Sequence, residues 1–395
     1  MRYKRLPQDF IVEEQITLPN SERGQYALYR VQKQGVTTLT VQRDIAEQLG
    51  RSRSDIQFPA LKDRRSFAVQ HVSIQGTGPG SISGDGFEAT FIGRGSRPLG
   101  PQDITGNRFT IVLRDLLPDE AAALPDRLLQ LAARGAPNYF DDQRFGSFSP
   151  GNTPIGKLIL LRDAEGALRS YLTHPYAGDP GKVRRFKSTA QELWPNWQAL
   201  FEEAPRPSNF RSVLTYLRDH PLSSAEQNRT TYRKAINLIT PRLLAIYVQA
   251  YQSLVWNRIA AQYISAQSAG IVDAIQIAGE SFVIHRSPCT LRTRSTMIAL
   301  PNHRARYSDP TIADIVTTVL AQEGLMLGDM KARILKQAYL PKNSRPLLMF
   351  PEDIATSSVE IDDLAPGRHK CSVTFTLTRG SYATLLIKTL DQHTE

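Results

Sequence analysis

The chain has 395 residues, 41% of them hydrophobic and 22% charged, which is typical of a globular protein with two domains or three. An excess of basic residues, 48 Lys and Arg against 38 Asp and Glu, gives a net charge of +10 and favours a polyanionic partner such as nucleic acid. We expect no membrane span and no signal peptide, because the chain has no apolar run of about 18 residues and its N-terminus has no apolar core. The two distant cysteines, Cys289 and Cys371, suggest neither disulfides nor a zinc site and fit a reducing cytoplasm, where buried free thiols are expected.

The first 50 residues predict two strands followed by a helix. The strands span residues 9–14 and 26–33. A helix follows from Thr37 or Thr38 to about Leu49, where Gly50 stops it. Its apolar residues follow helical spacing and are Leu39, Val41, Ile45, Ala46 and Leu49.

The stretch 58–74 carries the strongest chemical signal, a charged turn that leads into a strand. Asp63 stands there between Lys62 and the arginines Arg64 and Arg65. Neighbouring cations favour the ionised carboxylate, which a nucleophile or a general base requires. Taken alone, such a turn is more often a solvated loop whose charges pair with one another.

The next elements are a hairpin, a strand and a helix. The glycine-rich stretch 76–86 lacks the residue order of a phosphate-binding loop, so we interpret it as a hairpin connection before a strand at 87–92. A further strand is predicted at 106–114. A helix at 119–134 has the apolar set Leu124, Leu128, Leu129 and Leu131.

The loop 137–146, PNYFDDQRFG, holds more functional groups than a connection needs. Its aromatic residues can stack on an unpaired base, and Asn138 can hydrogen-bond a base edge or a sugar. For each aromatic singly, namely Tyr139, Phe140 and Phe145, burial as a structural anchor is the more common role, with Arg144 paired to an acid.

Helical patterns dominate from about residue 155. Helices are predicted at 208–219, 224–238, 241–262 and 310–323, and strand character at 272–285. Two basic clusters, at 182–187 and 292–306, either track phosphates or form solvated faces. Strand character returns at 370–378, and Gly380 and Ser381 are expected to cap a last helix that begins near Tyr382. No HExxH, HxxH or GxSxG order is present, so metal and serine-nucleophile chemistry lack support.

Together these motifs resemble the tRNA pseudouridine synthases of the TruD type and their eukaryotic relatives. The resemblance rests on Lys4 with the following PQDF, the segment 33–38, LKDRRSFAVQ, GNRFTIVLR, PNYFDDQRFG and the terminal GSYAT. It implies an α+β fold: a mixed, largely antiparallel pseudouridine-synthase sheet with flanking helices, plus an inserted α/β domain. We therefore expect a discontinuous catalytic domain at 1–154 and 341–395 and an inserted domain at 155–340.

The family resemblance also implies a function and a set of site residues. The catalytic aspartate of the family matches Asp63, and its substrate-contacting residues match Phe10, Asn138 and Tyr382, with Lys4, Lys62 and Phe140 nearby. The implied reaction converts a uridine of tRNA, typically uridine 13, to pseudouridine without metal or cofactor. We expect a monomeric cytoplasmic protein that binds tRNA or another structured RNA and no membrane.

The reaction leaves two roles open for the aspartate, and the sequence leaves alternatives for the protein. Asp63 either attacks C1′ or removes a sugar proton. Lys4, Lys62 or Arg64 would supply the cation beside it. The chain departs from the family pattern at Ala60, at Ser66 to Ala68, at Asp141 and at Ile387-Lys388. The alternatives are therefore a synthase for another RNA, an RNA-binding protein without catalysis, or, much less favoured, a metal-assisted phosphodiesterase using Asp63, Asp141 and Asp142.

Overall fold

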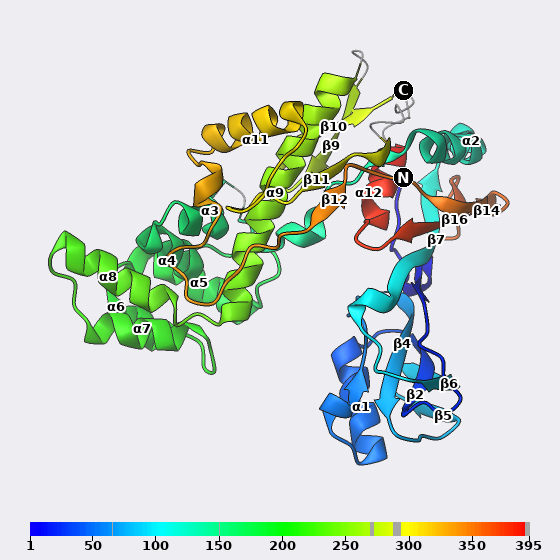
Figure 1. The fold of residues 1–395 in the computed structure, drawn as a ribbon, viewed down its shortest axis with the longest axis horizontal. Helices are drawn as coiled ribbons and strands as arrows, with labels where there is room; N and C mark the ends of the chain where they lie inside the picture. The colour runs from blue at the N-terminus through cyan, green and yellow to red at the C-terminus, as the bar shows by residue number, and fades with distance from the viewer. Residues whose placement is uncertain (65, 150, 269–271, 287–293, 392–395) are drawn as a thin grey trace. The chain divides into compact units, whose positions relative to one another are not determined.

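The computed structural model describes residues 1–64, 66–149, 151–268, 272–286 and 294–391 (Figure 1). The chain divides into two compact units, Met1–Ala136 with Met349–Glu395, and Pro137–Leu348. These bounds differ from the expected functional division at 154/155 and 340/341, which stays a prediction. Arg65, Cys289 and Arg292 lie outside the described residues.

The first unit is built on a large mixed β-sheet. Its strands follow the order β14-β16-β7-β1-β4-β2-β6-β5, with β15 beside β16 and β3 beside β4. Within the described sheet β1 and β4 run parallel, and all other neighbouring strands run antiparallel, so the sheet is mixed, as the family resemblance implied. The strands are β1 (Phe10–Ile16), β2 (Tyr26–Lys33), β3 (Ile56–Gln57), β4 (Phe67–Gln75), β5 (Ser81–Gly84), β6 (Phe87–Gly95), β7 (Ile104–Leu116), β14 (Glu352–Thr356), β15 (Glu360–Ile361) and β16 (His369–Thr378).

Helix α1 (Thr38–Leu49) covers one face of the strands β2, β4 and β6 (Figure 1). The Thr37 side chain accepts a hydrogen bond from the Thr40 amide at 3.1 Å, and Gly50 ends the helix in the left-handed conformation at φ 61°. Buried side chains of the helix and of alternate strand residues form one core there, which includes Tyr29, Val31, Val41, Ile45, Val72 and Ile74. The predicted helix is confirmed, except that Leu39 is exposed because it lies on the solvent face.

The two ends of the chain meet in the first unit through β7. Strand β7 pairs with β1 on one side and with β16 on the other. Its buried Arg114 binds both oxygens of Asp9 at 3.0 Å and donates to Asp362 at 2.7 Å. The oxygen Oδ2 of Asp9 also accepts from the Leu6 amide at 2.8 Å. One guanidinium therefore fixes the segment before β1 and the segment before β16.

Two further helices complete the first unit, α2 (Pro118–Arg134) and α12 (Ala383–Asp391). Leu124, Leu128 and Leu131 of α2 are buried as predicted, but Leu129 points to solvent and is 59% exposed. The predicted cap of the last helix by Gly380 and Ser381 is not among the described hydrogen bonds of α12, which begins after Tyr382.

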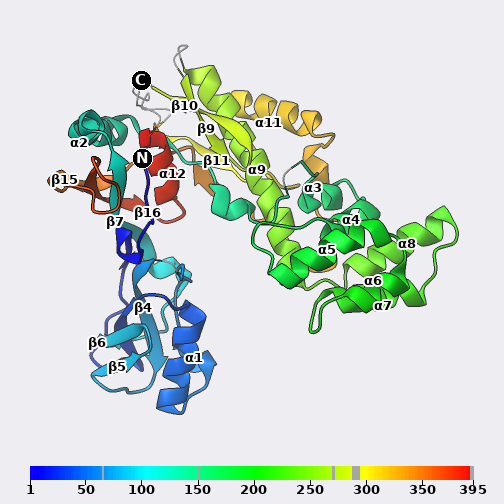
Figure 2. The ribbon, with the colours of Figure 1, turned by 180° about the vertical axis from the view of Figure 1, so that it is seen from behind.

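The second unit is mainly helical, with short antiparallel strand pairs (Figure 2). Its longest helix, α9, is flanked by α11 and by β10. The helices are α3 (Ile155–Leu160), α4 (Ala164–Thr173), α5 (Gly181–Leu193), α6 (Trp197–Glu203), α7 (Phe210–Asp219), α8 (Ala225–Ile236), α9 (Pro241–Gln267) and α11 (Pro310–Gln322). The strands are β9 (Val272–Ile277), β10 (Glu280–His285), β11 (Met297–Ala299) and β12 (Ser344–Pro346), while β8 (Ala136–Pro137) and β13 (Leu348–Met349) lie at the bounds of the unit.

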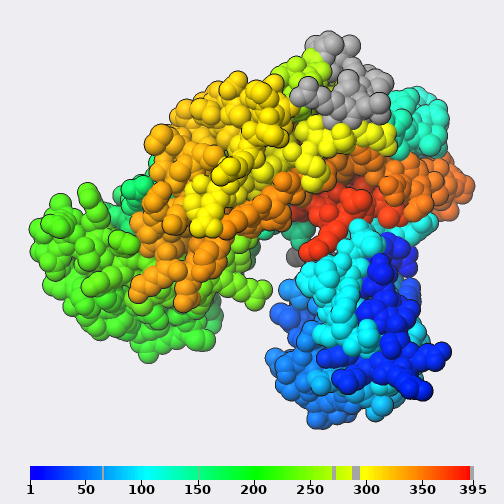
Figure 3. Space-filling view, in the orientation of Figure 1, coloured from blue at the N-terminus to red at the C-terminus, as the bar shows by residue number. Residues whose placement is uncertain are grey.

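An extended segment after α11 lies along the second unit, in orange in Figure 3. Side chains of the helical region hold its backbone. The Gln249 amide donates to the Tyr339 carbonyl at 3.2 Å, and the Gln252 amide donates to the Pro341 carbonyl at 2.9 Å. Polar side chains of α9 thus supplement the backbone hydrogen bonds of this segment, which include the pairing of β12 with β11.

The sequence analysis missed the helices α3 to α6, because their apolar patterns are short and include Gly and polar residues. It also misjudged part of the basic cluster at 182–187. Lys187 lies on the buried face of α5 and pairs with Asp179 at 2.8 Å. Among the described residues, none of the helices combines the length and the apolar composition that crossing a membrane requires.

Replacing Arg114 with methionine is expected to lower the free energy of unfolding by about 3 kcal/mol, because Asp9 and Asp362 would stay buried without a counter-charge. Urea denaturation of the parent and the variant measures this loss. Arg43→Met is the matched control, since Arg43 pairs with Asp44 and Glu47 at the exposed surface. Similar midpoints for all three proteins would contradict the role given to Arg114.

Candidate active site

The register of the first sheet brings Phe10, a predicted site residue, to the same face as two residues that the sequence analysis did not single out. Val12 pairs with both Phe109 and Ala68, and Ala68 pairs with Lys33. Directly paired residues point to the same face of a sheet, as do residues two apart in a strand. Phe10, Phe109 and Lys33 therefore share one face.

The parallel pairing of β1 and β4 sets the position of the Asp63 turn. Ile11 pairs with Phe67, so both strands begin at the same end of the sheet. Phe10 is the first residue of β1, and Asp63 lies four residues before β4 begins. The turn and the aromatic side chain thus belong to the same end of the first unit.

The Asp63 turn is anchored through its backbone. The Asp63 carbonyl accepts hydrogen bonds from the Lys33 ammonium at 2.8 Å and from the Ser66 hydroxyl at 3.2 Å. The Lys62 amide donates to the Thr38 hydroxyl at 3.0 Å. Asp63 itself belongs to the exposed residues of the structure. A fixed backbone with an exposed carboxylate is suited to meet a substrate from solvent.

Lys33 is a buried cation beneath this turn, and the sequence analysis missed its role. It is 1% exposed, and its ammonium also donates to the Val36 carbonyl at 3.1 Å. Burial lowers the pKa of Lys33, whereas the negative charge of Asp63 acts in the opposite direction. The burial of Lys33 could have been predicted from its position in the strand, because it follows Ala27, Tyr29 and Val31, the residues two apart that are buried.

Lys62, one of the cations predicted to stand beside Asp63, is held by a different acid. Its ammonium lies 3.5 Å from Glu14 Oε1 and donates to the Asn107 side chain. Burial lowers the pKa of Lys62, and the charge of Glu14 partly offsets this. The other oxygen of Glu14 accepts from the His71 amide at 3.1 Å, beyond the residues where β1 and β4 pair. Glu14, which the sequence analysis did not single out, therefore positions the residue next to Asp63.

The remaining residues of the predicted site in the first unit are Lys4, Phe10, Arg64 and Tyr382. The Lys4 ammonium lies 4.0 Å from the centre of the Phe10 ring, and Phe109 meets that ring edge-on at a centroid distance of 6.0 Å. Phe10 is buried, so Lys4 covers its face. The Arg64 guanidinium donates to the Gly35 carbonyl at 2.7 Å. Tyr382 is half-buried immediately before α12.

Asn138 and Phe140 belong to the second unit, where Arg345 organises them. Arg345 donates to the side-chain oxygen of Asn138 at 2.8 Å and to its backbone carbonyl at 2.6 Å. The Arg345 guanidinium also lies 4.2 Å from the centre of the Phe140 ring. Asn138 donates through Nδ2 to the Pro346 carbonyl at 3.2 Å. A carboxamide has two N–H donors and two acceptor positions, so these bonds use part of the capacity of Asn138, which is 2% exposed.

The aromatic residues of the loop 137–146 are buried, as their common structural role predicts. Tyr139 donates to the Val283 carbonyl at 2.8 Å, and Phe140 exchanges two 2.8 Å backbone hydrogen bonds with the Asn257 side chain. Arg144 donates to the Ser253 hydroxyl at 3.0 Å. Asp141, one of the departures from the family pattern, is buried. Among the described residues, no three His, Cys, Asp or Glu side chains converge as a metal-binding group.

Comparison with known proteins shows similarity to one family along nearly the full chain. The family model described as tRNA pseudouridine synthase D (TruD) matches residues 1–390. A Methanococcus maripaludis protein named Probable tRNA pseudouridine synthase D 1 is 27% identical, with 98% of each chain covered. The tRNA pseudouridine synthase D of Leptospira interrogans is 28% identical over 98% of this chain and 95% of its own. A crystal structure from Methanosarcina mazei, titled as a TruD protein, has a TM-score of 0.74 at 23% identity over 98% of this chain and 93% of its own, and shows the same fold.

We expect Glu14 and Lys62 to be energetically coupled. Removing either charge alone leaves the other buried without its partner, so Glu14→Gln and Lys62→Met should each destabilise the protein. The double variant should lose about 1–3 kcal/mol less than the sum of the single losses. Urea denaturation of the four proteins measures this coupling. Strictly additive losses would show that the two side chains do not act as a pair.

Proposed function

Because the chain belongs to the TruD family of tRNA pseudouridine synthases, we propose that it isomerises uridine 13 of tRNA with Asp63 as the catalytic residue. The observation that carries this proposal is the Asp63 turn, whose backbone is anchored to buried Lys33 while its side chain is exposed. Phe10 is the first residue of β1. This strand runs parallel to β4, which follows the Asp63 turn.

The reaction needs an anion at the ribose. The C1′–N1 bond breaks, the uracil turns over while it is held, and a new bond forms from C1′ to C5. An ionised Asp63 begins this sequence by attacking C1′, or by removing a sugar proton. Both steps use the carboxylate, so both require Asp63 to be deprotonated.

A buried cation lies beneath the Asp63 turn. Lys33 interacts electrostatically with Asp63 from inside the unit, where screening by water is weak. Lys62 is held by Glu14 and contributes mainly by fixing the residue next to Asp63. Lys33 is therefore a further cation near Asp63, in addition to the expected Lys4, Lys62 or Arg64.

Aromatic residues are assigned to the base. A uridine in structured RNA must leave its stack before the chemistry, which costs a few kcal/mol that new stacking and phosphate contacts offset. In the proposal Phe10, Tyr382 and Phe140 contact the displaced nucleotide, and Lys4 over the Phe10 ring adds a positive charge. Asn138 contacts it through the polar capacity that Arg345 and Pro346 leave unused.

The Asp63→Asn variant is expected to release tritium from [5-³H]uridine-labelled tRNA at least about a thousandfold more slowly than the parent protein. The label leaves C5 when the new glycosidic bond forms, and an amide can neither attack C1′ effectively nor act as a base. Asp85→Asn, in an exposed turn between β5 and β6, is the matched control and should keep the parent rate.

A transcript with cytidine in place of uridine 13 locates the target in the same assay. Loss of release from this transcript would support the position, and undiminished release would assign another uridine. Full activity of Asp63→Asn would overturn the catalytic assignment. Binding without release by the parent protein would favour an RNA-binding protein.

We expect the fall of the reaction rate at alkaline pH to reflect deprotonation of Lys33. Burial lowers the pKa of Lys33, so its ammonium loses the proton at a pH below 10.5, and the release rate should fall as the pH rises through that value. Lys33→Arg should move this limb to higher pH, since arginine stays protonated. Single-turnover tritium release between about pH 7 and 10 tests this.

The control for this profile is Lys331→Arg, a change at an exposed lysine of the second unit, which should leave the limb in place. An alkaline limb that is identical in the parent and in Lys33→Arg would rule out Lys33 as its source.

A further inference from the structure

Two segments of the second unit, 297–306 and 330–346, lie side by side. Strand β11 in the earlier segment pairs with β12 in the later one. The His303 amide also donates to the Met330 carbonyl at 3.0 Å. The segments are yellow and orange in Figure 3, where both reach the surface of the second unit. Residues that are far apart in the sequence thus form one surface.

Both segments carry exposed cations, and neither contains Asp or Glu. The exposed cations are Arg304, Arg306, Lys331, Arg333, Lys336 and Lys342, which we call the basic surface. Within the part of the chain that the structure describes, no carboxylate forms an ion pair with any of them. Asp329, the acid just before the later segment, pairs with Arg162 at 3.4 Å. The positive charge of the basic surface is therefore uncompensated.

The electrostatics at His303 indicate that charges from both segments act at one place. Burial lowers the pKa of His303. The positive charges that lower it further are those of Lys331, Arg304 and Lys342. Like charges held close together repel one another and attract an anionic partner.

The backbone beneath the basic surface is fixed by side chains of the helical region. Asn237, just after α8, donates to the Ile334 carbonyl and accepts from the Lys336 amide, both at 2.8 Å. Gln252 of α9 donates to one backbone carbonyl in each segment, at 3.0 and 2.9 Å. The cations thus extend from a backbone that is ordered before any partner binds, which lowers the entropy cost of binding.

One exposed aromatic ring accompanies these cations. Tyr339 is 75% exposed and lies between Lys336 and Lys342 in the sequence. Its carbonyl accepts a hydrogen bond from the Gln249 side chain at 3.2 Å, so the backbone is held while the ring faces solvent. An exposed aromatic face beside cations is the combination that binds single-stranded RNA, because a base stacks on the ring while phosphates meet the charges.

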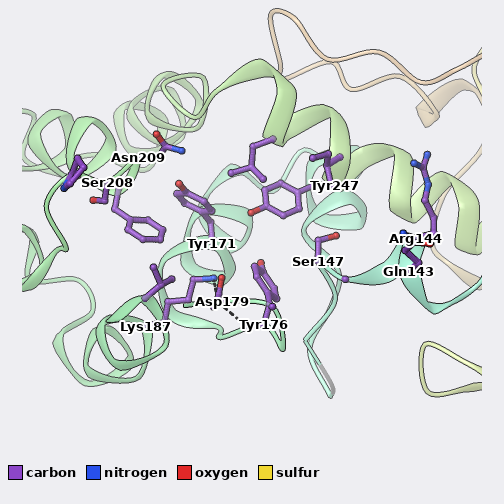
Figure 4. A pocket seen from close by; sticks show the side chains of 17 residues that line it. Gln143, Arg144, Ser147, Tyr171, Tyr176, Asp179, Lys187, Ser208, Asn209 and Tyr247 are labelled. Carbon is purple, nitrogen blue, oxygen red and sulfur yellow. Dashed lines mark hydrogen bonds and ion pairs between the residues drawn. The ribbon is translucent and has the colours of Figure 1, made fainter. Parts of the chain in front are cut away.

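Other aromatic residues of the second unit do not offer such a face. In Figure 4 Tyr247 lies between Tyr171 and Tyr176, at a centroid distance of 6.4 Å from each, and all three are buried. Lys187 covers the Tyr176 ring and pairs with Asp179 at 2.8 Å. These rings and this cation already have partners, whereas Tyr339 and the basic surface face solvent.

We propose that this face of the second unit binds a single-stranded stretch of RNA, with an unpaired base on Tyr339 and the adjoining phosphates at Arg304, Lys336 and Lys342. The inference goes beyond the proposed function but rests on it for the RNA, since tRNA has unpaired bases in its loops. The face serves binding and takes no part in the isomerisation.

The charges are tested by the triple variant Arg304→Gln, Lys336→Gln and Lys342→Gln. Fluorescence anisotropy at several salt concentrations gives the Kd for tRNA and its salt dependence. Losing three phosphate contacts to a single strand should reduce the slope of log K against log salt by about two and raise the Kd at least about tenfold at roughly 0.1 M salt.

The matched control for this variant removes three cations that are already paired with acids. It replaces Arg30, Arg43 and Arg218, the partners of Glu13, Asp44 and Asp219, with glutamine. We expect this control to keep the salt slope of the parent protein, because paired cations gain little from a phosphate.

The stacked base is tested by Tyr339→Ala, which should raise the Kd for tRNA roughly tenfold without changing the salt slope. The same loss is expected with a single-stranded RNA of roughly 12 nucleotides, but not with an RNA duplex of equal length, which has no unpaired base. Tyr339→Phe keeps the ring and should keep the parent Kd. Ile361→Ala, at a 77% exposed position of the first unit, is the control for loss of an exposed apolar side chain.

Tritium release at saturating tRNA separates this proposal from the proposed function. The rate should be the same in the parent protein, the triple variant and Tyr339→Ala. Absence of release by the parent protein would count against the proposed function alone, because the Kd values still report the basic surface. A salt slope unchanged in the triple variant, or a Kd unchanged in Tyr339→Ala, would overturn the proposal.

Discussion

The first unit depends on one buried guanidinium. Arg114 of β7 neutralises Asp9 from the N-terminal segment and Asp362 from the C-terminal segment, and it also binds Asp363 at 2.8 Å. Buried carboxylates are tolerated only when their charge is compensated and hydrogen-bonded, so Arg114 stabilises both ends of the chain in addition to the pairing of β1 and β16 with β7. The same contact fixes the turn before β1 and thereby the position of Phe10.

The candidate site also contains buried charges that are compensated by hydrogen bonds or by an opposite charge. Glu14, Lys62 and Lys33 are buried or nearly so, and each is held by a backbone amide, a backbone carbonyl or an opposite charge. Asp63 differs, since its backbone is anchored and its side chain is exposed. A rigid frame with one exposed carboxylate provides a preorganised anion without burying it before the substrate arrives.

Local patterns predicted the local elements well. Strand β2 and helix α1 follow the residues that alternation, the Thr37 cap and Gly50 indicated. The errors arise where burial depends on distant partners. Leu39 and Leu129 have helical spacing but face solvent, because no described element covers that side of their helices enough to bury them. Lys33 looked like the polar end of a strand, yet the Asp63 carbonyl accepts a hydrogen bond from its ammonium, and Lys33 is a buried cation. That contact joins residues 30 positions apart and leaves no local signature.

The basic run at 182–187 shows why residue type alone does not assign a role. In sequence its cations look equivalent, but a helix has 3.6 residues per turn and separates them. Lys187 turns inward to Asp179 and the Tyr176 ring, whereas Lys182, Arg184 and Arg185 stay in water. An ammonium already paired with a carboxylate gains little from a phosphate, while the exposed cations can still release counterions to a polyanion. The same short run therefore combines one buried, paired lysine with exposed cations that are available to a polyanion.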